Sequence, residues 1–515
     1  MWDPAEYVQR GKLLAQGVLT PVGWNPLVSA FYAVIYLFVG SSPFWLIHAY
    51  GIGRFVLYVL IWLSGLLIAG KGRSLFQPWM MTAMLFVSPV VLLILNNGSD
   101  ATFAVMSALA FWQILSFHEN EKMRHLITGS AFVGLSALAR NDGLVLIVIF
   151  ISLGISIHLA RTFGRLDFFK RLGVAITACL IPFILIVGVY ASFYGLVTGR
   201  YDFGTVKRLY DNFEFGEGVA YRHLHPDRDS FIDGVFQSRR LYGTPEENKY
   251  SVVLAIKRNP RAYFRRVIQM IKQSPKLATS AYGEKVGILL FILAGMGMIE
   301  LIRRKEYSLL VITLSWPLHI MVSFIAVIDP RRFVFPYFDL FFLACVGASS
   351  LPAVLLPRKY YFCWVSILVF LAMLAVFIGG PTAFTTFIII ASAFAIGRFL
   401  LQHRGQQGGV KEGVWILLLV LALILREPYP APKFRNLGEE PAEKAILYLH
   451  DHMGQSSFLA SYSPGYAFAS NMKWLRISYR QRDLKSGKEF VEWMKTNHSG
   501  AILVDPLLRD KEPYI

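Results

Sequence analysis

Two aspartates stand in short polar segments of an otherwise apolar sequence. Asp3 opens the segment Met1-Trp-Asp-Pro-Ala-Glu-Tyr7, and Asp100 ends the short loop Asn96-Asn-Gly-Ser-Asp100 between two apolar runs. Glu6 follows Asp3 by three residues, which places both acids on one face of a helix. If both loops face the same side of a membrane, two carboxylates meet at one membrane surface. Carboxylates so placed can take or hold a proton, which predicts chemistry on a lipid-borne substrate.

The composition is that of a membrane protein. The chain has 515 residues, of which 55% are hydrophobic and only 16% charged, and its mean hydropathy is +0.49. It holds many apolar runs of about twenty residues, enough to cross a hydrocarbon core of roughly 30 Å. The net charge of +18 fits loops anchored at anionic lipid better than nucleic-acid binding. The three cysteines lie in apolar runs and do not have the spacing of a disulfide framework or a zinc site. The first 26 residues show no cleavable signal peptide.

Twelve apolar runs predict transmembrane helices. They cover residues 48–70, 77–95, 101–117, 125–140, 143–160, 172–195, 286–302, 307–328, 333–356, 360–379, 382–400 and 413–426. The stretch 27–46 is apolar enough to be a thirteenth. Its prolines and the Gly40-Ser-Ser-Pro43 break favour a pair of interfacial helices instead, so residues 1–47 are expected to form an external segment.

The distribution of lysine and arginine predicts the orientation. The loops at 71–76, 118–124, 161–171, 303–306, 357–359 and 401–412 carry about two to four basic residues each, which places them in the cytoplasm. The N-terminal segment, Asp100, the 196–285 loop and the C-terminal tail then all fall outside. Residues 48–195 and 286–429 form the two membrane blocks of this arrangement, in the bacterial inner membrane.

Two regions are expected to leave the membrane. Residues 196–285 hold sixteen Lys/Arg against ten Asp/Glu, and Tyr250–Leu277 reads as a basic amphipathic helix on the lipid surface or as a solvated loop helix. Residues 430–515 alternate helix and strand, with helices at 441–452 and 484–497 and strands at 458–462 and 501–505. This pattern predicts a small soluble α/β domain. The sequence of this segment contains no glycine-rich phosphate-binding motif. The fold class is therefore an all-α polytopic membrane bundle with an α/β appendage.

Several motifs occur in the order typical of one enzyme superfamily. They are Asp3-Pro-Ala-Glu6-Tyr7, Asn25-Pro26-Leu27, Arg54 near a helix end, Asp100 in the next external loop, Ala139-Arg140-Asn141-Asp142-Gly143 and Arg332-Phe333-Val334-Phe335-Pro336. In order and spacing the chain resembles the GT-C integral-membrane glycosyltransferases, such as protein O-mannosyltransferases and lipid A aminoarabinose transferases. The superfamily has a membrane helix ahead of its first acidic loop, for thirteen helices in all, whereas this sequence begins within that loop.

The resemblance implies roles for the acids. These enzymes transfer a sugar from a polyprenyl phosphate to an acceptor hydroxyl of a lipid, glycan or protein, so a base must take the acceptor proton while the phosphate leaves. Asp3 is the expected base, with the cap of a helix at 4–16 as its structural alternative. Glu6 is expected to orient the acceptor or hold a metal, or else to form a capping box with Asp3. Asp100 is expected to position the acceptor or help hold a divalent cation, or to cap the helix at 101–117.

Arginines predicted to lie on the extracytoplasmic side of the membrane are candidates to bind the phosphate of the sugar donor. Arg140, Arg331 and Arg332 stand where the positive-inside bias disfavours arginine, so they are expected to bind a lipid phosphate or to reach out to headgroups. Arg54 is a weaker candidate of the same kind. Asp339 is an intramembrane carboxylate, which makes it either a functional group or the partner of an arginine in the bundle.

Two histidines are candidate metal ligands, with weaker sequence support than the acids and arginines above. His223-Leu-His225-Pro-Asp227 has the residue types of a metal site, although such clusters are common by chance in loops. His319, on an apolar span, reads as a hydrogen-bonded core residue. No cofactor is required by the sequence, and a divalent metal ion is an open alternative.

Two other classes of function compete with glycosyl transfer. A transporter or lipid flippase would place ionisable groups near the midplane and show internal repeats, whereas these spans are almost free of midplane charge and show no repeat. An envelope polysaccharide polymerase or ligase would also have a large external loop and a polyprenyl-linked substrate, but would depend on external arginines more than on an early aspartate. A sugar-transfer assay separates these classes.

Overall fold

The fold is known from a computed structural model of the chain. It describes residues 2–18, 26–40, 45–71, 81, 85, 90–95, 98–162, 168–199, 205–224, 231–282, 284–319, 336–355, 458–461, 473–476, 492, 496 and 499–502. The predicted spans at 360–379, 382–400 and 413–426 lie outside these residues. Within the described residues almost every element is a helix, as the apolar runs predict.

Two short helices open the chain. Helix α1 (Trp2–Ala15) packs along α2 (Pro26–Val39), and both contact α3 (Trp45–Ala69). The Lys12 ammonium lies 4.5 Å from the centre of the Trp45 ring, a cation–π contact that ties α1 to the start of α3. The expected N-terminal helix at 4–16 is confirmed, starting two residues earlier. Whether α1 and α2 lie in the membrane interface stays a prediction.

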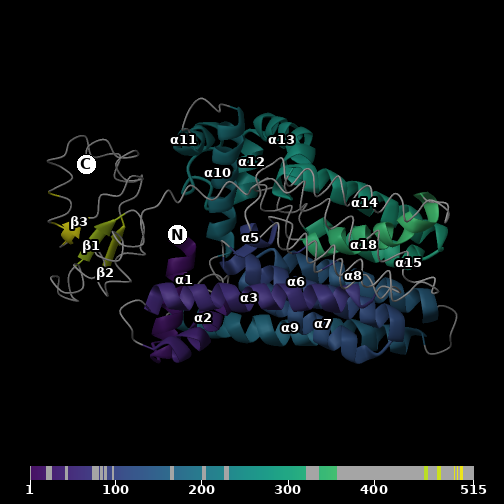
Figure 1. The fold of residues 1–515 in the computed structure, drawn as a ribbon. Coiled ribbons are helices and arrows are strands. Elements are labelled where there is room, and N and C mark those ends of the chain that lie inside the picture. Colours follow the sequence, from purple (N-terminus) through teal and green to yellow (C-terminus); the bar gives the residue numbers. More distant parts are fainter. Residues whose placement is uncertain are drawn as a thin grey trace, which may run out of the picture.

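The main bundle is built from α3 and four helices that follow it. These are α6 (Gly98–Asn120), α7 (Met123–Ala139), α8 (Gly143–Thr162) and α9 (Phe168–Thr198), preceded by the short α5 (Val90–Leu95). They run along one common direction in Figure 1, with α6 packed against α3 and α7, and α7 against α9. The predicted spans at 48–70, 101–117, 125–140, 143–160 and 172–195 are thus helices, with ends that differ by a few residues.

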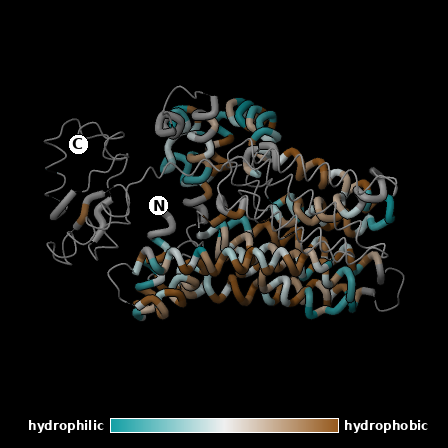
Figure 2. The backbone as a smooth tube through the Cα atoms, viewed as in Figure 1, coloured by the Kyte–Doolittle hydropathy of each residue, from teal (hydrophilic) through white to brown (hydrophobic). Residues whose placement is uncertain are grey.

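Four of these helices are long and apolar enough to cross a membrane. They are His48–Ala69, Gly98–Asn120, Gly143–Ala160 and Phe169–Thr198. Only 17% of the apolar window of α9 is buried, and apolar residues such as Leu185 and Val189 are more than half exposed. The bundle is brown with hydrophobic residues along its length in Figure 2. An apolar exterior of this extent fits lipid rather than water.

A second layer is formed by α14 (Glu284–Arg303), α15 (Tyr307–Ser315) and α18 (Tyr337–Leu355). Helices α14 and α18 approach each other closely at two glycines. A Cβ atom on Gly297 would lie 2.0 Å from the Leu343 carbonyl oxygen, and one on Gly347 would lie 1.9 Å from that of Leu293. Small residues allow two helix backbones to approach this closely, as in other membrane bundles.

The long segment between α9 and α14 forms four helices. They are α10 (Thr205–Leu224), α11 (Phe231–Tyr242), α12 (Val252–Arg258) and α13 (Pro260–Ala281), above one end of the bundle in Figure 1. The expected single helix over Tyr250–Leu277 is wrong, because the chain breaks at Asn259. The Asn259 side chain accepts a hydrogen bond from the Ala262 amide at 3.1 Å, and Pro260 starts the new helix. Asparagine before proline is a typical helix start.

A small parallel sheet occurs near the C-terminus. Its strands β1 (Phe458–Ser461), β2 (Lys473–Arg476) and β3 (Ser499–Ile502) have the order β2-β1-β3, with both pairs parallel. Strand β1 matches the prediction at 458–462, β3 begins two residues before the predicted strand at 501–505, and β2 was not predicted. The predicted helix at 441–452 lies outside the described residues, so the α/β domain as a whole stays a prediction.

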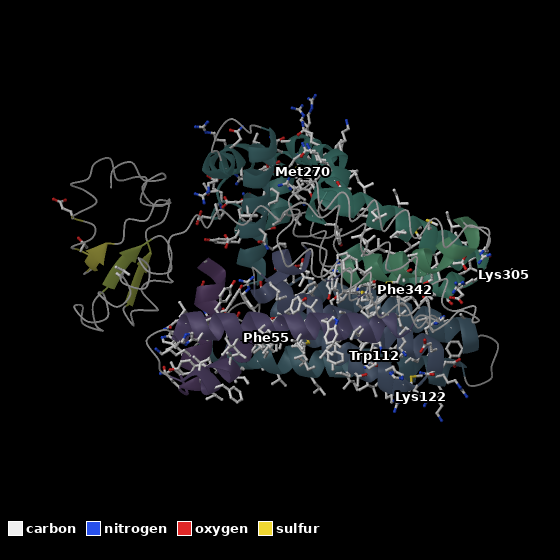
Figure 3. The ribbon with its side chains drawn as sticks, in the orientation of Figure 1. Phe55, Trp112, Lys122, Met270, Lys305 and Phe342 are labelled. Carbon is white, nitrogen blue, oxygen red and sulfur yellow. The ribbon has the colours of Figure 1, made fainter. Side chains whose placement is uncertain are left out.

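The two ends of the bundle differ in charge. Lys71 at the end of α3 binds Glu119 at the end of α6, with 2.7 Å between Nζ and Oε2. Lys122 and Lys305 lie at this same end, far from the N-terminus in Figure 3. The opposite end carries α1 and the start of α6. Lys71, Lys122 and Lys305 come from loops predicted to be cytoplasmic and lie at one end, whereas Arg140 lies at the other; the assignment of the first end to the cytoplasm stays a prediction.

Candidate functional site

Three polar side chains meet at the end of the bundle that carries α1. The Arg140 guanidinium binds the Asp100 carboxylate through Nη1, and its Nε donates to Oδ2 of Asp142 at 2.9 Å. Asp100 is 2% exposed, while the Arg140 and Asp142 side chains are 14% and 15% exposed. We call these three residues the Arg140 cluster. It joins the first turn of α6 to the turn between α7 and α8.

The turn that carries Arg140 is shaped by its own sequence. Helix α7 ends at Ala139, Arg140 is extended, and the Gly143 amide closes the turn on the Arg140 carbonyl at 3.0 Å. A Cβ atom on Gly143 would lie 2.3 Å from the Ala137 amide nitrogen, so a side chain there would push α8 away from α7. The Arg-Asn-Asp-Gly motif therefore builds a tight corner that holds Arg140 and Asp142 on one side.

Helix α1 brings a further polar group to the cluster. Tyr7 is fully buried, and its phenol lies near enough to Arg140 to interact with the guanidinium. Asp3 precedes Tyr7 by one helical turn in α1, and α1 contacts α6. The start of α1, which carries Asp3, and the start of α6, which carries Asp100, therefore lie at the same end of the bundle. The side chain of Asp3 lies outside the described residues.

The electrostatic balance of the Arg140 cluster is uneven. One guanidinium faces two carboxylates, so with both acids ionised the cluster carries a net charge of −1. Burial by itself would lower the pKa of Arg140, but the neighbouring Asp100 and Asp142 carboxylates raise it above its usual value. Arg140 therefore stays charged. The cluster holds Asp100 in one position while its excess negative charge can attract a proton or a cation.

The expected capping role of Asp100 is wrong. Helix α6 starts at Gly98, so Asp100 lies within its first turn and binds Arg140, forty residues later in the chain. A carboxylate in the first turn still interacts favourably with the helix dipole. The structure thus shows a specific partner for Asp100 that the sequence did not reveal.

His319 is a buried residue near the Arg140 cluster. It is 1% exposed, its Nδ1 lies 2.7 Å from the Trp316 carbonyl oxygen, and its ring lies 5.8 Å from that of Phe103 on α6. Asp142 is near enough to influence it electrostatically. The expectation of a hydrogen-bonded core histidine is confirmed. Its position beside Asp142 was not predicted, because the two residues are far apart in sequence.

Two other predicted residues have partners within their own helices. Glu6 forms an ion pair with Arg10 one turn later in α1. The Arg54 guanidinium lies 5.5 Å from the centre of the Tyr50 ring in α3, and its charge also acts on Tyr32. The roles of Glu6 in orienting the acceptor and of Arg54 in binding phosphate stay predictions.

Asp339 is buried in the second layer. It lies in the first turn of α18, is 2% exposed, and its carboxylate oxygens have no hydrogen-bond partner among the described residues. Tyr282, before α14, is close enough to interact with it electrostatically. The arginine partner considered from the sequence is thus not found in the described part of the chain. Arg331 and Arg332, shortly before α18, lie outside it.

The described residues do not fit a divalent cation. No group of three or more His, Cys, Asp and Glu side chains gathers in the described ranges closely enough to hold one. Asp100 and Asp142 come together, but the Arg140 guanidinium occupies the position between them that a cation would need. His223 belongs to α10, but its side chain, like all of His225, lies outside the described residues, so the metal site there stays a prediction.

Comparison with known proteins identifies the fold. No protein-family model and no curated protein matches the chain. Among solved structures, it is similar to ArnT from Cupriavidus metallidurans in the apo state, with a TM-score of 0.50 and 14% identity over 96% of this chain and 84% of that one. The match to ArnT bound to undecaprenyl phosphate has a TM-score of 0.49 and 13% identity, over 97% of this chain and 85% of that one. The match to the archaeal oligosaccharyltransferase AglB from Archaeoglobus fulgidus has a TM-score of 0.48 and 12% identity, over 97% of this chain and 65% of that one.

The likeness to apo ArnT covers nearly the whole chain. At this level of identity it shows a shared fold and says nothing of individual residues. The resemblance to GT-C membrane glycosyltransferases is thereby confirmed at the level of the fold.

Proposed function

We propose that this chain is a membrane glycosyltransferase that moves a sugar from a polyprenyl phosphate to an acceptor hydroxyl. The observation that supports the proposal is the position of Tyr7, on the same helix α1 as Asp3, beside the Arg140 cluster in a bundle whose fold is similar to that of ArnT. The bundle end opposite to the short basic loops is, by the positive-inside rule, the extracytoplasmic one. The reaction would therefore take place at the outer face of the inner membrane.

The transfer needs a base and a site for the leaving phosphate. The acceptor oxygen attacks the anomeric carbon of the sugar, the bond from that carbon to the phosphate oxygen breaks, and the phosphate takes the bonding electrons. Asp3 is the proposed base that accepts the hydroxyl proton, so that attack and departure proceed with inversion. Arg331, Arg332 and Arg54 are the proposed partners of the departing phosphate, because guanidinium groups bind phosphate oxygens in pairs.

The Arg140 cluster has a supporting role in this scheme. Arg140 holds Asp100 in place, and Asp100 is the proposed group that positions the acceptor next to Asp3. The predicted contact of Arg140 with the donor phosphate stays a prediction.

The donor class belongs to the proposal, and the shared fold is consistent with it. ArnT has also been crystallised with undecaprenyl phosphate bound. We infer that this chain takes a sugar carried on a lipid phosphate of the same class. The acceptor is a hydroxyl of a lipid, a glycan or a protein.

The test is transfer of radiolabelled sugar from polyprenyl phosphate by the purified chain in lipid nanodiscs. We expect Asp3→Asn to lower the rate by about a hundredfold or more, since positioned general bases typically contribute 10²–10⁴-fold. Glu119→Gln is the matched control: it removes an acid at the opposite end of the bundle and should leave the rate unchanged. Equal rates in Asp3→Asn and the unaltered chain would remove Asp3 as base, and movement of the lipid without cleavage of the sugar would favour a flippase.

A further inference from the structure

Helix α13 is divided between a buried and an exposed face. Its buried face contacts α10, and it includes Arg266, Met270 and Leu277, which are all less than 9% exposed. Met270 marks this helix in Figure 3. The opposite face carries Phe264, Ile268 and Ile271, which are 59%, 53% and 52% exposed. Three large apolar side chains at helical spacing form a continuous exposed stripe, which is unusual for a surface in contact with water.

Basic side chains lie along one side of this stripe. Four exposed cations lie on the same face of α13, namely Arg261, Arg265, Lys272 and Lys276. None of them has a carboxylate partner among the described residues, and the sequence of α13 contains neither aspartate nor glutamate. We call these four cations and the three apolar side chains the α13 outer face. Its charge is therefore purely positive.

The surroundings of α13 indicate what covers this face. Helix α14 follows α13 in the chain, and its Ile288, Ile292 and Ile299 are 49%, 57% and 67% exposed along one side. An exposed isoleucine stripe of this kind fits the acyl chains of a bilayer. The α13 outer face thus comes directly before a helix with an exposed apolar side, which is where an interfacial helix is expected.

We propose that the α13 outer face binds the anionic surface of the membrane. Phe264, Ile268 and Ile271 insert between the headgroups, and the four cations bind the lipid phosphates. Each cation close to an anionic membrane contributes roughly 1 kcal/mol, or about a fivefold preference, so four of them select anionic over zwitterionic lipid. The surface is separate from the Arg140 cluster and does not depend on the transfer reaction.

Photo-crosslinking tests this proposal on the full chain. Phe264 is replaced by p-benzoylphenylalanine, and the protein is placed in nanodiscs of phosphatidylcholine and phosphatidylglycerol, with one or the other lipid radiolabelled. We expect a lipid adduct that favours phosphatidylglycerol. The same photoreactive residue at Lys249, an exposed position in the turn before α12, should give little lipid adduct, and at Phe169 on α9 it should label both lipids.

Charge variants separate the electrostatic part from general contact with lipid. Changing all four cations of the α13 outer face to glutamine should lower the preference for phosphatidylglycerol by about fivefold or more. The matched control, Lys122→Gln with Arg124→Gln and Lys305→Gln, removes exposed cations at the other end of the bundle and should leave it unchanged. The proposal is overturned if the adduct at position 264 is no stronger than at position 249, if it is with another protein chain, or if the four changes leave the lipid preference intact.

Discussion

Two buried arginines organise two regions of this molecule in different ways. In the bundle, Arg140 is shared by Asp100 and Asp142. In the helices α10–α13, Arg266 pairs with one acid, Glu217, at 2.9 Å. We call the second group, together with the rings around it, the Arg266 cluster. Each arginine binds an acid that lies forty or more residues earlier in the chain.

The surroundings of the two guanidinium groups differ. The Arg266 guanidinium lies 5.1 Å from the centres of both the Phe213 and Tyr263 rings, and the Tyr242 hydroxyl lies beside Glu217. Its charge is balanced by one carboxylate and its faces are covered by aromatic rings. The Arg140 cluster instead has a surplus carboxylate, and its third neighbour is the phenol of Tyr7.

The difference in charge balance suggests that the Arg266 cluster stabilises the fold, whereas the Arg140 cluster is suited to chemistry. A neutral, ring-covered ion pair has no reason to attract a further charged group, so the Arg266 cluster holds α10 and α13 together. A cluster with a net charge of −1 keeps an unbalanced acid at a fixed position, which suits a site that handles protons or positively polarised atoms. Changes at the two arginines should therefore have different consequences.

The largest effect is expected for Arg140→Gln. It leaves Asp100 and Asp142 buried next to each other without a cation, which should cost roughly 3–5 kcal/mol of stability and also displace Asp100. We expect sugar transfer to fall by about a hundredfold or more in the protein that remains folded. Transfer is measured in nanodiscs, and folding by the temperature at which a thiol dye reaches the buried Cys179 and Cys345.

Arg124→Gln is the control for this change. Arg124 is exposed at the start of α7, the helix that ends next to Arg140, so its loss should affect neither property. Full transfer activity in Arg140→Gln would show that the cluster only stabilises the fold, and the contrast between the two arginines would then disappear.

A smaller and purely structural effect is expected for Arg266→Met. The change leaves the Glu217 carboxylate buried without its partner, so the melting temperature should fall, by an amount equivalent to about 3 kcal/mol. The transfer rate per folded molecule should stay the same. Replacing both partners, as Arg266→Met with Glu217→Leu, should recover most of the lost stability, since an apolar pair is often as stable as a buried ion pair. A loss of transfer at an unchanged melting temperature would contradict the structural role.

The helices of the bundle could be predicted because their length is dictated by the membrane. Runs of about twenty apolar residues mark α3, α6, α8 and α9 within a few residues of their ends. The break between α12 and α13 was missed, although Asn259-Pro260 is a visible signal for a new helix. Strand β2 was missed because its four residues, which begin with Lys473 and end with Arg476, show no alternation long enough to recognise.

The site could be predicted only in part. Asp3 and Asp100 were recognised as isolated acids in polar loops, and the positive-inside bias placed them at one end of the bundle. The bond between Asp100 and Arg140 could not be predicted, because it depends on how α6 packs against α7. The partner roles of Tyr7 and Asp142 were also missed, although both belong to motifs that were recognised. Such contacts depend on tertiary structure, which one sequence does not reveal.

The pH dependence of stability can test the Arg266 cluster without removing its arginine. Burial raises the pKa of Glu217, with Arg266 and the Tyr242 hydroxyl acting in the opposite direction. The folded protein therefore binds the Glu217 proton more tightly than the unfolded chain does. The resulting stabilisation is complete below the usual glutamate pKa of about 4.3 and is lost as the pH rises through the folded value.

Glu217→Gln should remove this dependence. From about pH 4 to pH 7 the melting temperature of the unaltered chain should fall by about 1 °C relative to that of Glu217→Gln for each kcal/mol lost, because the entropy of unfolding grows with chain length. The melting temperatures of the unaltered chain and of Glu217→Gln are measured with the same thiol dye, and the dye is calibrated at each pH. Parallel curves over this range would mean that Glu217 has the same affinity for protons in the folded and unfolded states.

The smallest effect is expected at the exposed ion pair on the other end of the bundle. Lys71 and Glu119 are 2.7 Å apart, with side chains 17% and 41% exposed. Water and salt screen such a pair, so Glu119→Gln should cost less than about 1 kcal/mol and leave transfer unchanged. Raising the salt concentration should reduce even this difference, whereas the effect of Arg140→Gln should persist. If Glu119→Gln destabilised the chain as strongly as Arg140→Gln, then burial and charge balance would not be what distinguishes the Arg140 cluster.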